Sequence, residues 1–158
     1  MKKTNAVRIL ESLKMPFILR EFAVDKSDFS AERAAKLLGV KVDQIYKTLV
    51  VRGDQSGVII ASIPGGSELD LKALAHLSSN KRVEMVPLKE LQPLTGYFRG
   101  AVSPLSMKYN YRYYLDESAF CYSSVIISAG THGLQIELAP RDLITVTGAV
   151  AGIITRHD

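Results

Sequence analysis

Hairpins mixed with short helices, without regular alternation of strand and helix, predict that this chain folds as a mixed-sheet α+β domain. The length of 158 residues is sufficient for a hydrophobic core. Hydrophobic residues make up 47% and charged residues 23%, an ordinary globular composition that excludes a disordered chain. No repeat or low-complexity tract divides the sequence, so we expect one domain over residues 1–158.

Helical spacing and capping residues predict the first elements. Residues 5–14 carry apolar side chains at helical spacing, which predicts a helix. Residues 17–24 alternate as a strand does. Ser30 is a good N-cap for a helix over residues 31–38, and Gly39 stands where a helix C′ glycine belongs.

The rest of the chain predicts two hairpins and further short helices. Residues 45–51 and 58–63 are β-rich and flank a turn, so they predict the first hairpin. Ser67, with Asp70 three residues later, resembles a capping box and predicts a helix through about residue 77. The remaining predicted elements are strands at 83–86, 112–115, 124–128, 134–138 and 149–154, a helical turn at 87–91 and a last helix from Pro140.

Composition also limits the classes of function. Cys121 is the one cysteine, so no internal disulfide can form, and no apolar segment resembles a signal peptide or a membrane span. We therefore expect a cytoplasmic protein with no membrane partner. One cysteine and three histidines disfavour a structural zinc site, and we expect no metal or cofactor. The net charge of +4 weakly favours a polyanionic partner.

Lys47 is the strongest local anomaly. In a strand it shares one face with Ile45, Leu49 and Val51, so it interrupts an aliphatic row. Such a lysine projects into a pocket, finds a partner or extends to solvent. The alternative reading is an edge-strand lysine that blocks aggregation, which the strand alone favours.

A loop-rich segment over residues 96–114 offers two further candidates. The glycines of residues 96–104 allow a ligand to approach the backbone closely, although the segment by itself favours an ordinary surface loop. Tyrosines and phenylalanines alternate there with Arg99, Lys108 and Arg112, and no acidic residue occurs. Aromatic rings can stack on unpaired RNA bases while the cations contact phosphates, but packing of the tyrosines in a strand is an equal alternative.

Known catalytic motifs are absent from the sequence. Neither a Gly-x-Ser-x-Gly nucleophile motif, a P-loop, a dinucleotide-binding fingerprint nor His-Glu-x-x-His is present. We expect His132 to be an exposed turn residue and Cys121 a packed thiol. Any reaction must therefore depend on positioning of the substrate more than on a protein nucleophile.

Several segments in order resemble the YbaK/EbsC-type aminoacyl-tRNA deacylases, which are related to the editing domain of bacterial prolyl-tRNA synthetase. The first match is Gln44–Val51, the strand that contains Lys47. The further matches are Leu69–Lys72, Lys81–Met85, Thr95–Tyr97, Gly100–Pro104, Ser128–Gly130, Gly133–Leu134 and Ile136–Leu138. A match to one tetrapeptide is weak evidence for a family, but these matches occur in the same order and cover nearly the whole chain.

The resemblance implies a compact domain with a mixed, barrel-like sheet flanked by helices. It implies hydrolysis of mischarged tRNA, typically Cys-tRNA(Pro) and also Cys-tRNA(Cys), in which the substrate thiol can attack its own ester and form a thiolactone. Carried over by position, Lys47 is the catalytic residue. The implied substrate-binding residues are Phe22, Tyr46, Thr48, Gly100, Ala101, Ser103, Pro104, Ser128, Gly130 and Gln135. The expected tRNA contacts are Arg99, Lys108 and Arg112.

Two positions depart from the family pattern and leave the amino acid open. Phe22 stands where the family has a pocket tyrosine, and Gln135 stands where cysteine-directed members have an aspartate. Alanine, serine and threonine esters are therefore alternative substrates. A non-catalytic module that binds tRNA or a synthetase is the alternative from another functional class. The expected partners are the acceptor end of mischarged tRNA and, as a candidate, prolyl-tRNA synthetase, with no role for DNA.

Overall fold

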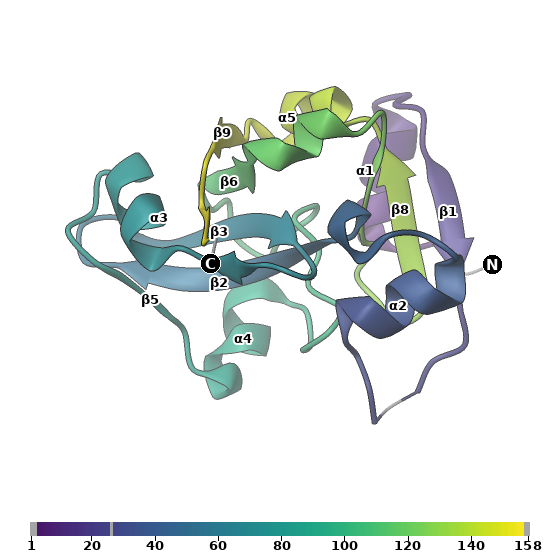
Figure 1. Cartoon of the computed structure of the whole chain (residues 1–158), viewed down its shortest axis with the longest axis horizontal. Helices are drawn as coiled ribbons and strands as arrows, with labels where there is room; N and C mark the ends of the chain where they lie inside the picture. The colour runs from purple at the N-terminus through teal and green to yellow at the C-terminus, as the bar shows by residue number, and fades with distance from the viewer. Residues whose placement is uncertain (1–2, 26, 157–158) are drawn as a thin grey trace.

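Across the residues that the computed structural model describes, 3–25 and 27–156, hydrogen bonds group the strands into three sheets. The five-stranded sheet has the order β5 (Val83–Met85), β2 (Tyr46–Gly53), β3 (Gly57–Pro64), β6 (Tyr113–Asp116) and β9 (Val150–Gly152). The three-stranded sheet has the order β1 (Ile18–Glu21), β8 (Leu134–Leu138) and β7 (Val125–Ser128). The smallest sheet pairs β4 (Glu68–Leu69) with β10 (Thr155–Arg156). With the helices around them, these sheets confirm the predicted mixed α+β class (Figure 1).

The five-stranded sheet combines antiparallel and parallel pairing. The predicted β2–β3 hairpin runs in unbroken antiparallel register from the pair Tyr46–Pro64 to the pair Gly53–Gly57. By contrast, β3 pairs with β6 and β6 with β9 in parallel. An isolated bridge between Ile45, which precedes β2, and Ile126 of β7 joins this sheet to the three-stranded one. The strands do not close into a ring over the described residues, so the predicted barrel-like arrangement consists of open sheets that meet at this bridge.

The helices surround the sheets and begin at residues that can cap them. They are α1 (Asn5–Ser12), α2 (Ala31–Leu38), α3 (Leu71–Leu77), α4 (Leu88–Thr95) and α5 (Pro140–Thr147), with 3₁₀ turns η1 (Val42–Gln44) and η2 (Glu117–Cys121). The predicted Ser30 cap is confirmed, because its hydroxyl accepts a hydrogen bond from the Arg33 N–H. The predicted Ser67 cap is wrong, since Asp70 caps α3 instead. The two residues between them are used to form β4.

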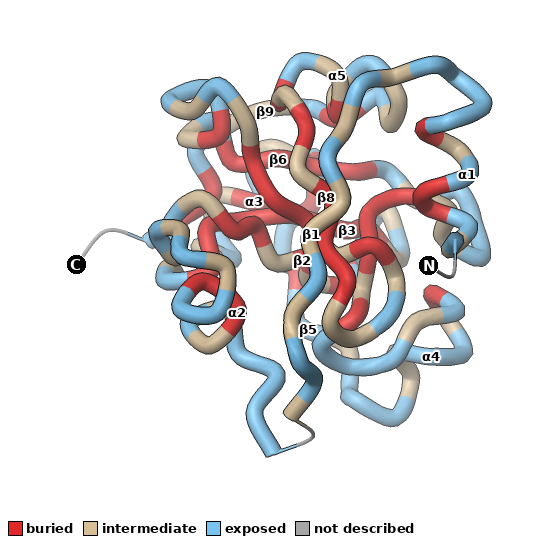
Figure 2. The backbone as a smooth tube through the Cα atoms, turned by 90° about the vertical axis from the view of Figure 1, so that its right-hand side faces the viewer, coloured by how far each residue is buried: buried red, intermediate tan, exposed pale blue. Residues whose placement is uncertain are grey.

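The main hydrophobic core lies between the two larger sheets. Figure 2 shows buried segments concentrated along the central strands, while the tip between β1 and α2 is exposed. Fully buried side chains from both sheets and from α1 meet in this core, among them Leu10, Val50, Ile60, Leu115, Ile127 and Ile136. Burial of this apolar area fixes the sheets relative to one another and so fixes the space at their junction.

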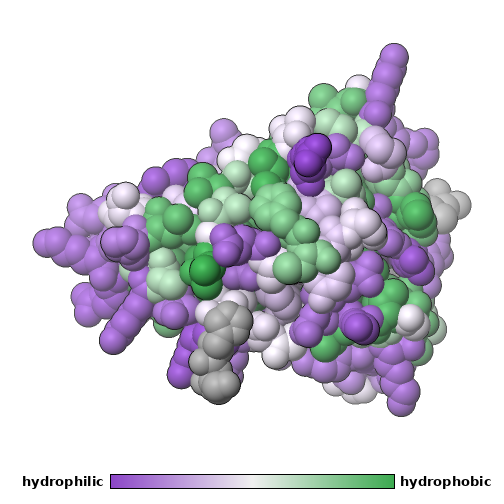
Figure 3. Space-filling view, turned by 45° about the horizontal axis from the view of Figure 1, so that its top comes forward, coloured by the Kyte–Doolittle hydropathy of each residue, from purple (hydrophilic) through white to green (hydrophobic). Residues whose placement is uncertain are grey.

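Surface hydropathy differs along the long axis of the molecule. Hydrophilic side chains dominate the tapered end, where Figure 1 places α3 and the β2–β3 turn, whereas larger apolar patches interrupt the broader part (Figure 3). No helix in the described part of the chain is long and apolar enough to cross a membrane.

Candidate active site

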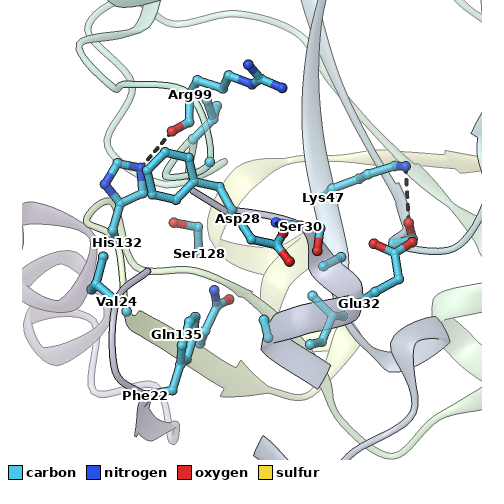
Figure 4. A pocket seen from close by; sticks show the side chains of 18 of the residues that line it. Phe22, Val24, Asp28, Ser30, Glu32, Lys47, Arg99, Ser128, His132 and Gln135 are labelled. Atoms are coloured by element: carbon cyan, nitrogen blue, oxygen red, sulfur yellow. Dashed lines mark hydrogen bonds between the residues drawn. The ribbon is translucent and has the colours of Figure 1, made fainter. Parts of the chain in front are cut away.

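A cavity of about 550 Å³ opens beside the junction of the two larger sheets. Ile45, which makes the bridge between the sheets, lines it. The other walls come from β2, from the ends of β7 and β8, from residues 22–34 and from residues 99–102. Figure 4 shows how side chains from these separate segments converge on one space.

Lys47 projects into this cavity from β2 and is half-buried. Its ammonium donates a hydrogen bond to the Gly65 carbonyl at 3.1 Å (Figure 4). Gly65 permits a close approach, because a Cβ there would lie 2.4 Å from the Ala31 Cβ. Within the described residues Lys47 makes no salt bridge, so two of its three N–H donors remain for a ligand.

Tyr46 and Thr48, the predicted neighbours of Lys47, have hydroxyls that are occupied by the protein. The Tyr46 hydroxyl is 2.7 Å from the Ser118 hydroxyl, and burial raises the pKa of Tyr46 to about 12. The Thr48 hydroxyl is 2.7 Å from that of Ser62, which also accepts a hydrogen bond from Tyr113. Both residues contribute surface to the cavity, but their polar atoms hold β2 in place.

Gln135 brings a polar group without a partner to the opposite wall. Its side chain is 8% exposed, and its Oε1 has no hydrogen-bond partner in the described structure. Ser128 pairs with it across β7 and β8, and its hydroxyl accepts a hydrogen bond from the Gly130 N–H at 3.1 Å. Phe22 contributes an apolar surface beside them. A buried acceptor without a partner is costly, so this wall is suited to a ligand that donates a hydrogen bond.

Residues 25–32 add an acidic rim that our sequence analysis missed. Asp25, Asp28 and Glu32 all line the cavity. Hydrogen bonds from Ser27 lower the pKa of Asp25, and those from Ser30 lower the pKa of Asp28, so both carboxylates are ionised at neutral pH. The repeated Asp-x-Ser pattern is typical of Asx turns and could have indicated this rim. The negative charge suits a cationic group on a ligand.

Phe29, Arg99 and His132 connect three loops at the mouth of the cavity. The rings of Phe29 and His132 stack with centroids 4.0 Å apart, and His132 Nε2 lies 2.7 Å from the Arg99 carbonyl oxygen (Figure 4). Gly100 has a φ of +81°, and a Cβ there would lie 2.6 Å from the Phe29 Cβ. His132 lies in a turn, as predicted, but these two contacts leave it half-buried instead of fully exposed.

Four predicted binding residues do not line the cavity: Ala101, Ser103, Pro104 and Gly130. Ala101 and Ser103 are buried behind the loop surface, where the Ser103 hydroxyl accepts a hydrogen bond from the Leu105 N–H. Gly130 packs closely against the Tyr97 ring. In this structure these residues shape the loops that form the wall, while Gly100 contributes wall surface itself.

The predicted tRNA-contact residues are separated. Arg99 lines the cavity, whereas Lys108 and Arg112 are exposed outside it. Tyr113 is buried in the main core and Tyr111 packs partly against it, as the packing alternative predicts. Tyr114 is buried in a second core, so the rings of Tyr113 and Tyr114 cannot stack on a base. Exposed rings of this segment remain at Phe98 and Tyr109.

Among the described residues, no group of three or more histidine, cysteine or acidic side chains could hold a metal ion. Cys121 is exposed at the end of η2, so the prediction that its thiol is packed is wrong. The neighbouring Phe120 is also half exposed, which shows that this turn faces solvent. The cavity instead offers an ammonium, a buried amide and an acidic rim.

Comparison with known proteins assigns this arrangement to a family. The model of the aminoacyl-tRNA editing domain matches residues 26–146. A protein of Enterococcus faecalis with the provisional name Cys-tRNA(Pro)/Cys-tRNA(Cys) deacylase EbsC is 48% identical over 99% of this chain and 96% of its own length. A proline–tRNA ligase of Lactobacillus helveticus is 26% identical over 70% of this chain, which corresponds to 20% of the ligase.

Solved structures agree with the sequence comparison. The crystal structure of a provisionally named trans-editing enzyme for prolyl-tRNA synthetase superposes with a TM-score of 0.82 at 26% identity. The match covers 99% of this chain and all of that one.

Proposed function

This chain belongs to the aminoacyl-tRNA editing domain family, and from that premise we propose that it is a deacylase that clears mischarged tRNA. The similarity to the Enterococcus faecalis protein, which extends over nearly the whole length of both chains, carries this conclusion. It makes Cys-tRNA(Pro) and Cys-tRNA(Cys) the first candidate substrates. We take residues 1–158 as one editing domain that acts in the cytoplasm, where translation takes place.

The cavity supports a role for Lys47 in catalysis. An aminoacyl ester is already activated, so correct placement and stabilisation of the developing oxyanion can be sufficient. Lys47 keeps two N–H donors free inside the cavity, and a carbonyl oxygen of the ester can accept them. We therefore propose that Lys47 binds the ester carbonyl and stabilises the negative charge that forms on it.

The remaining polar groups of the cavity suit the amino-acid part of the substrate. The free ammonium of an aminoacyl ester is a cation and a hydrogen-bond donor. Gln135 Oε1 is a buried acceptor without a partner, and Asp25 and Asp28 place negative charge at the rim. We propose that these residues hold the ammonium while Phe22 and Ser128 limit the size of the side chain.

The attacking group can be supplied by the substrate or by water. In a cysteinyl ester the thiol can attack the carbonyl carbon, which forms a thiolactone and releases the ribose hydroxyl with the proton. With alanine, serine or threonine esters, water must attack and the products are the free amino acid and tRNA. The hydroxyls of Ser30 and Ser128 accept hydrogen bonds from backbone N–H groups, and the Ser27 hydroxyl donates to the Asp25 carboxylate at 2.6 Å within a turn. Neither route requires a protein nucleophile.

The test is deacylation of purified Cys-tRNA(Pro) and Ala-tRNA(Pro) by the wild type, Lys47→Ala and the control Lys72→Ala. Lys72 is exposed on α3, so its removal deletes the same charge away from the cavity. We expect Lys47→Ala to lower kcat by roughly 100- to 1000-fold, the usual cost of removing an oxyanion donor. Circular dichroism should show that both variants remain folded.

Three outcomes would each contradict a part of this proposal. Equal activity of the two lysine variants would remove Lys47 from the mechanism. Undetectable deacylation by the wild type, together with measurable tRNA binding, would favour the non-catalytic binding module. Equal rates on cysteinyl, alanyl, seryl and threonyl tRNA would refute the preference for cysteine. A pull-down with prolyl-tRNA synthetase tests the candidate protein partner.

A further inference from the structure

A second hollow of about 410 Å³ adjoins the cavity. It is lined by Phe29, Leu88, Leu91, Gln92, Phe98, Arg99 and His132. Three of these residues, Phe29, Arg99 and His132, also line the cavity that contains Lys47. The two spaces are therefore neighbours on either side of a shared wall, and we call the second one the α4 groove.

The α4 groove is lined mainly by apolar and aromatic side chains. Leu88 and Leu91 lie one helical turn apart on α4, and Gln92 follows them with an amide. Leu88 is 61% exposed and Phe98 is 65% exposed, so both present apolar surface to solvent. A flat ligand with hydrogen-bonding edges suits this combination of an aromatic ring, leucines and one amide.

Charge differs sharply between the two spaces. The rim of the cavity includes the ionised Asp25 and Asp28, which repel phosphate. Arg99 is the one charged residue among those lining the α4 groove. Glu90 on α4 forms a salt bridge with Arg52 at 2.7 Å, so the negative charge of Glu90 is compensated. The phosphate groups of a nucleotide chain are therefore favoured at the α4 groove, beside Arg99.

We propose that the α4 groove binds the nucleobase of the terminal nucleotide, the one whose ribose carries the aminoacyl ester. This inference rests on the proposed function, because it needs the ester to lie beside Lys47. That nucleobase is the base nearest to the ester, and the groove is the space next to the cavity. The ribose then crosses the stacked Phe29–His132 wall, the base contacts Phe98 and Leu88, and Arg99 faces the phosphate.

The shared wall explains why such an arrangement would be precise. His132 contacts the Arg99 carbonyl and stacks on Phe29, so one residue positions parts of both spaces. A ligand that occupies the groove is thereby held at a fixed distance from the cavity. The binding energy of the base in the groove can then orient the ester, although the ester itself does not contact the groove.

The experiment compares Cys-tRNA(Pro) with an intact terminal nucleotide against the same tRNA with an abasic terminal sugar. Both substrates are given to the wild type, to Phe98→Ala and to the control Phe120→Ala. Phe98 and Phe120 are both exposed phenylalanines, but Phe120 lies on η2 and lines neither space. The readout is kcat/KM, with the unfolding midpoint of each variant as a check on folding.

We expect the wild type and Phe120→Ala to prefer the intact substrate by roughly 5- to 150-fold in kcat/KM, the range for stacking of one base on an aromatic side chain. Phe98→Ala should lose most of that preference and should cleave the abasic substrate as the wild type does.

An equal rate of the wild type on both substrates would overturn the inference while the deacylase function stands. A preference for the base that survives in Phe98→Ala would overturn it as well. If the variant is impaired only when a synthetase is present, the groove docks a protein and the inference is wrong. Failure of the wild type to cleave any charged tRNA would refute the proposed function itself, and the inference with it.

Discussion

The cavity joins two regions of different construction, a wall of strands and a rim of loops. On the wall, Lys47 belongs to a hairpin whose eight residue pairs are in continuous register, above fully buried isoleucines. On the rim, the described residues 22–25, 27–30 and 96–105 lack strands and helices. The two loops are linked through the stacked rings of Phe29 and His132 and the contact of His132 with the Arg99 carbonyl.

This contrast shows how the site divides its tasks. A group that stabilises a transition state must be held precisely, and the packed wall does this for Lys47. Groups that admit a bulky, charged substrate need more freedom, and the exposed residues of the rim loops, such as Phe98 and Arg99, provide it. We therefore expect substitutions of the buried side chains that pack behind Lys47 to affect stability, and substitutions in the rim to affect activity.

The largest effect on stability is expected in the wall. Ile136 on β8 is fully buried in the main core, so Ile136→Ala should lower the free energy of unfolding by about 2–5 kcal/mol through lost burial and a cavity. Ile153→Ala is the matched control, because Ile153 is 62% exposed. Urea denaturation checks both. Equal losses would show that the wall is not the more tightly packed region.

A smaller loss is expected when the hydroxyl network behind Lys47 is cut. Ser62 is fully buried and bonds to the hydroxyls of Thr48 and Tyr113. Ser62→Ala leaves both without this partner and should cost about 1–3 kcal/mol of unfolding free energy. Ser123→Ala, at an exposed position, should change it little. Retention of full stability in Ser62→Ala would show that the network does not support the wall.

An acid-dependent effect is expected at Glu137 on β8, the central strand of the three-stranded sheet. Hydrogen bonds from Ser124 and then from Arg20 lower the pKa of Glu137 from 4.5. The ionised Glu137 therefore stabilises the fold at pH values above its unfolded pKa. This stabilisation is lost as pH falls through the lower pKa that Glu137 has in the folded protein. At pH 7, Glu137→Gln should cost about 1 kcal/mol in urea denaturation, since Arg20 is partly screened by solvent.

The same variant supplies its own control. As pH falls below the unfolded value of 4.5 and on through the lower folded pKa, the stability difference between wild type and Glu137→Gln should shrink. A difference that stays constant from pH 7 to pH 3 would show that the charge of Glu137 does not stabilise the fold.

The rim should show the smallest change in stability and a clear change in activity. His132→Ala removes the contacts to Phe29 and Arg99, and we expect less than about 1 kcal/mol of lost stability because the rim is half exposed. Deacylation should fall by up to roughly 100-fold, because the loops are no longer held at the cavity mouth. The control is His76→Ala, at an exposed position of α3, which should retain full activity. A loss of stability as large as that of Ile136→Ala would remove the distinction between the regions.

The same contrast explains what could be predicted from the sequence. The strand around Lys47 was predictable because alternation along a buried strand is a strong local signal. Phe29 and His132 were missed because their contact depends on three loops that are distant in sequence. The β4–β10 pair was missed for a similar reason, since a two-residue strand has no pattern of its own. Several residues named from the family resemblance line the cavity, but the resemblance did not separate Gly100, which lines it, from Ser103, which is buried behind the loop surface.

The pairing of β1 with β8 has a consequence for the order in which the site is made. The two strands are far apart in the sequence, and Arg20 meets Glu137 across 117 positions of the chain. During synthesis on the ribosome, β1 and Lys47 emerge long before β7 and β8 can complete the cavity. We therefore expect that a nascent chain lacking β8 cannot edit, and that activity begins only when synthesis of the domain is nearly complete.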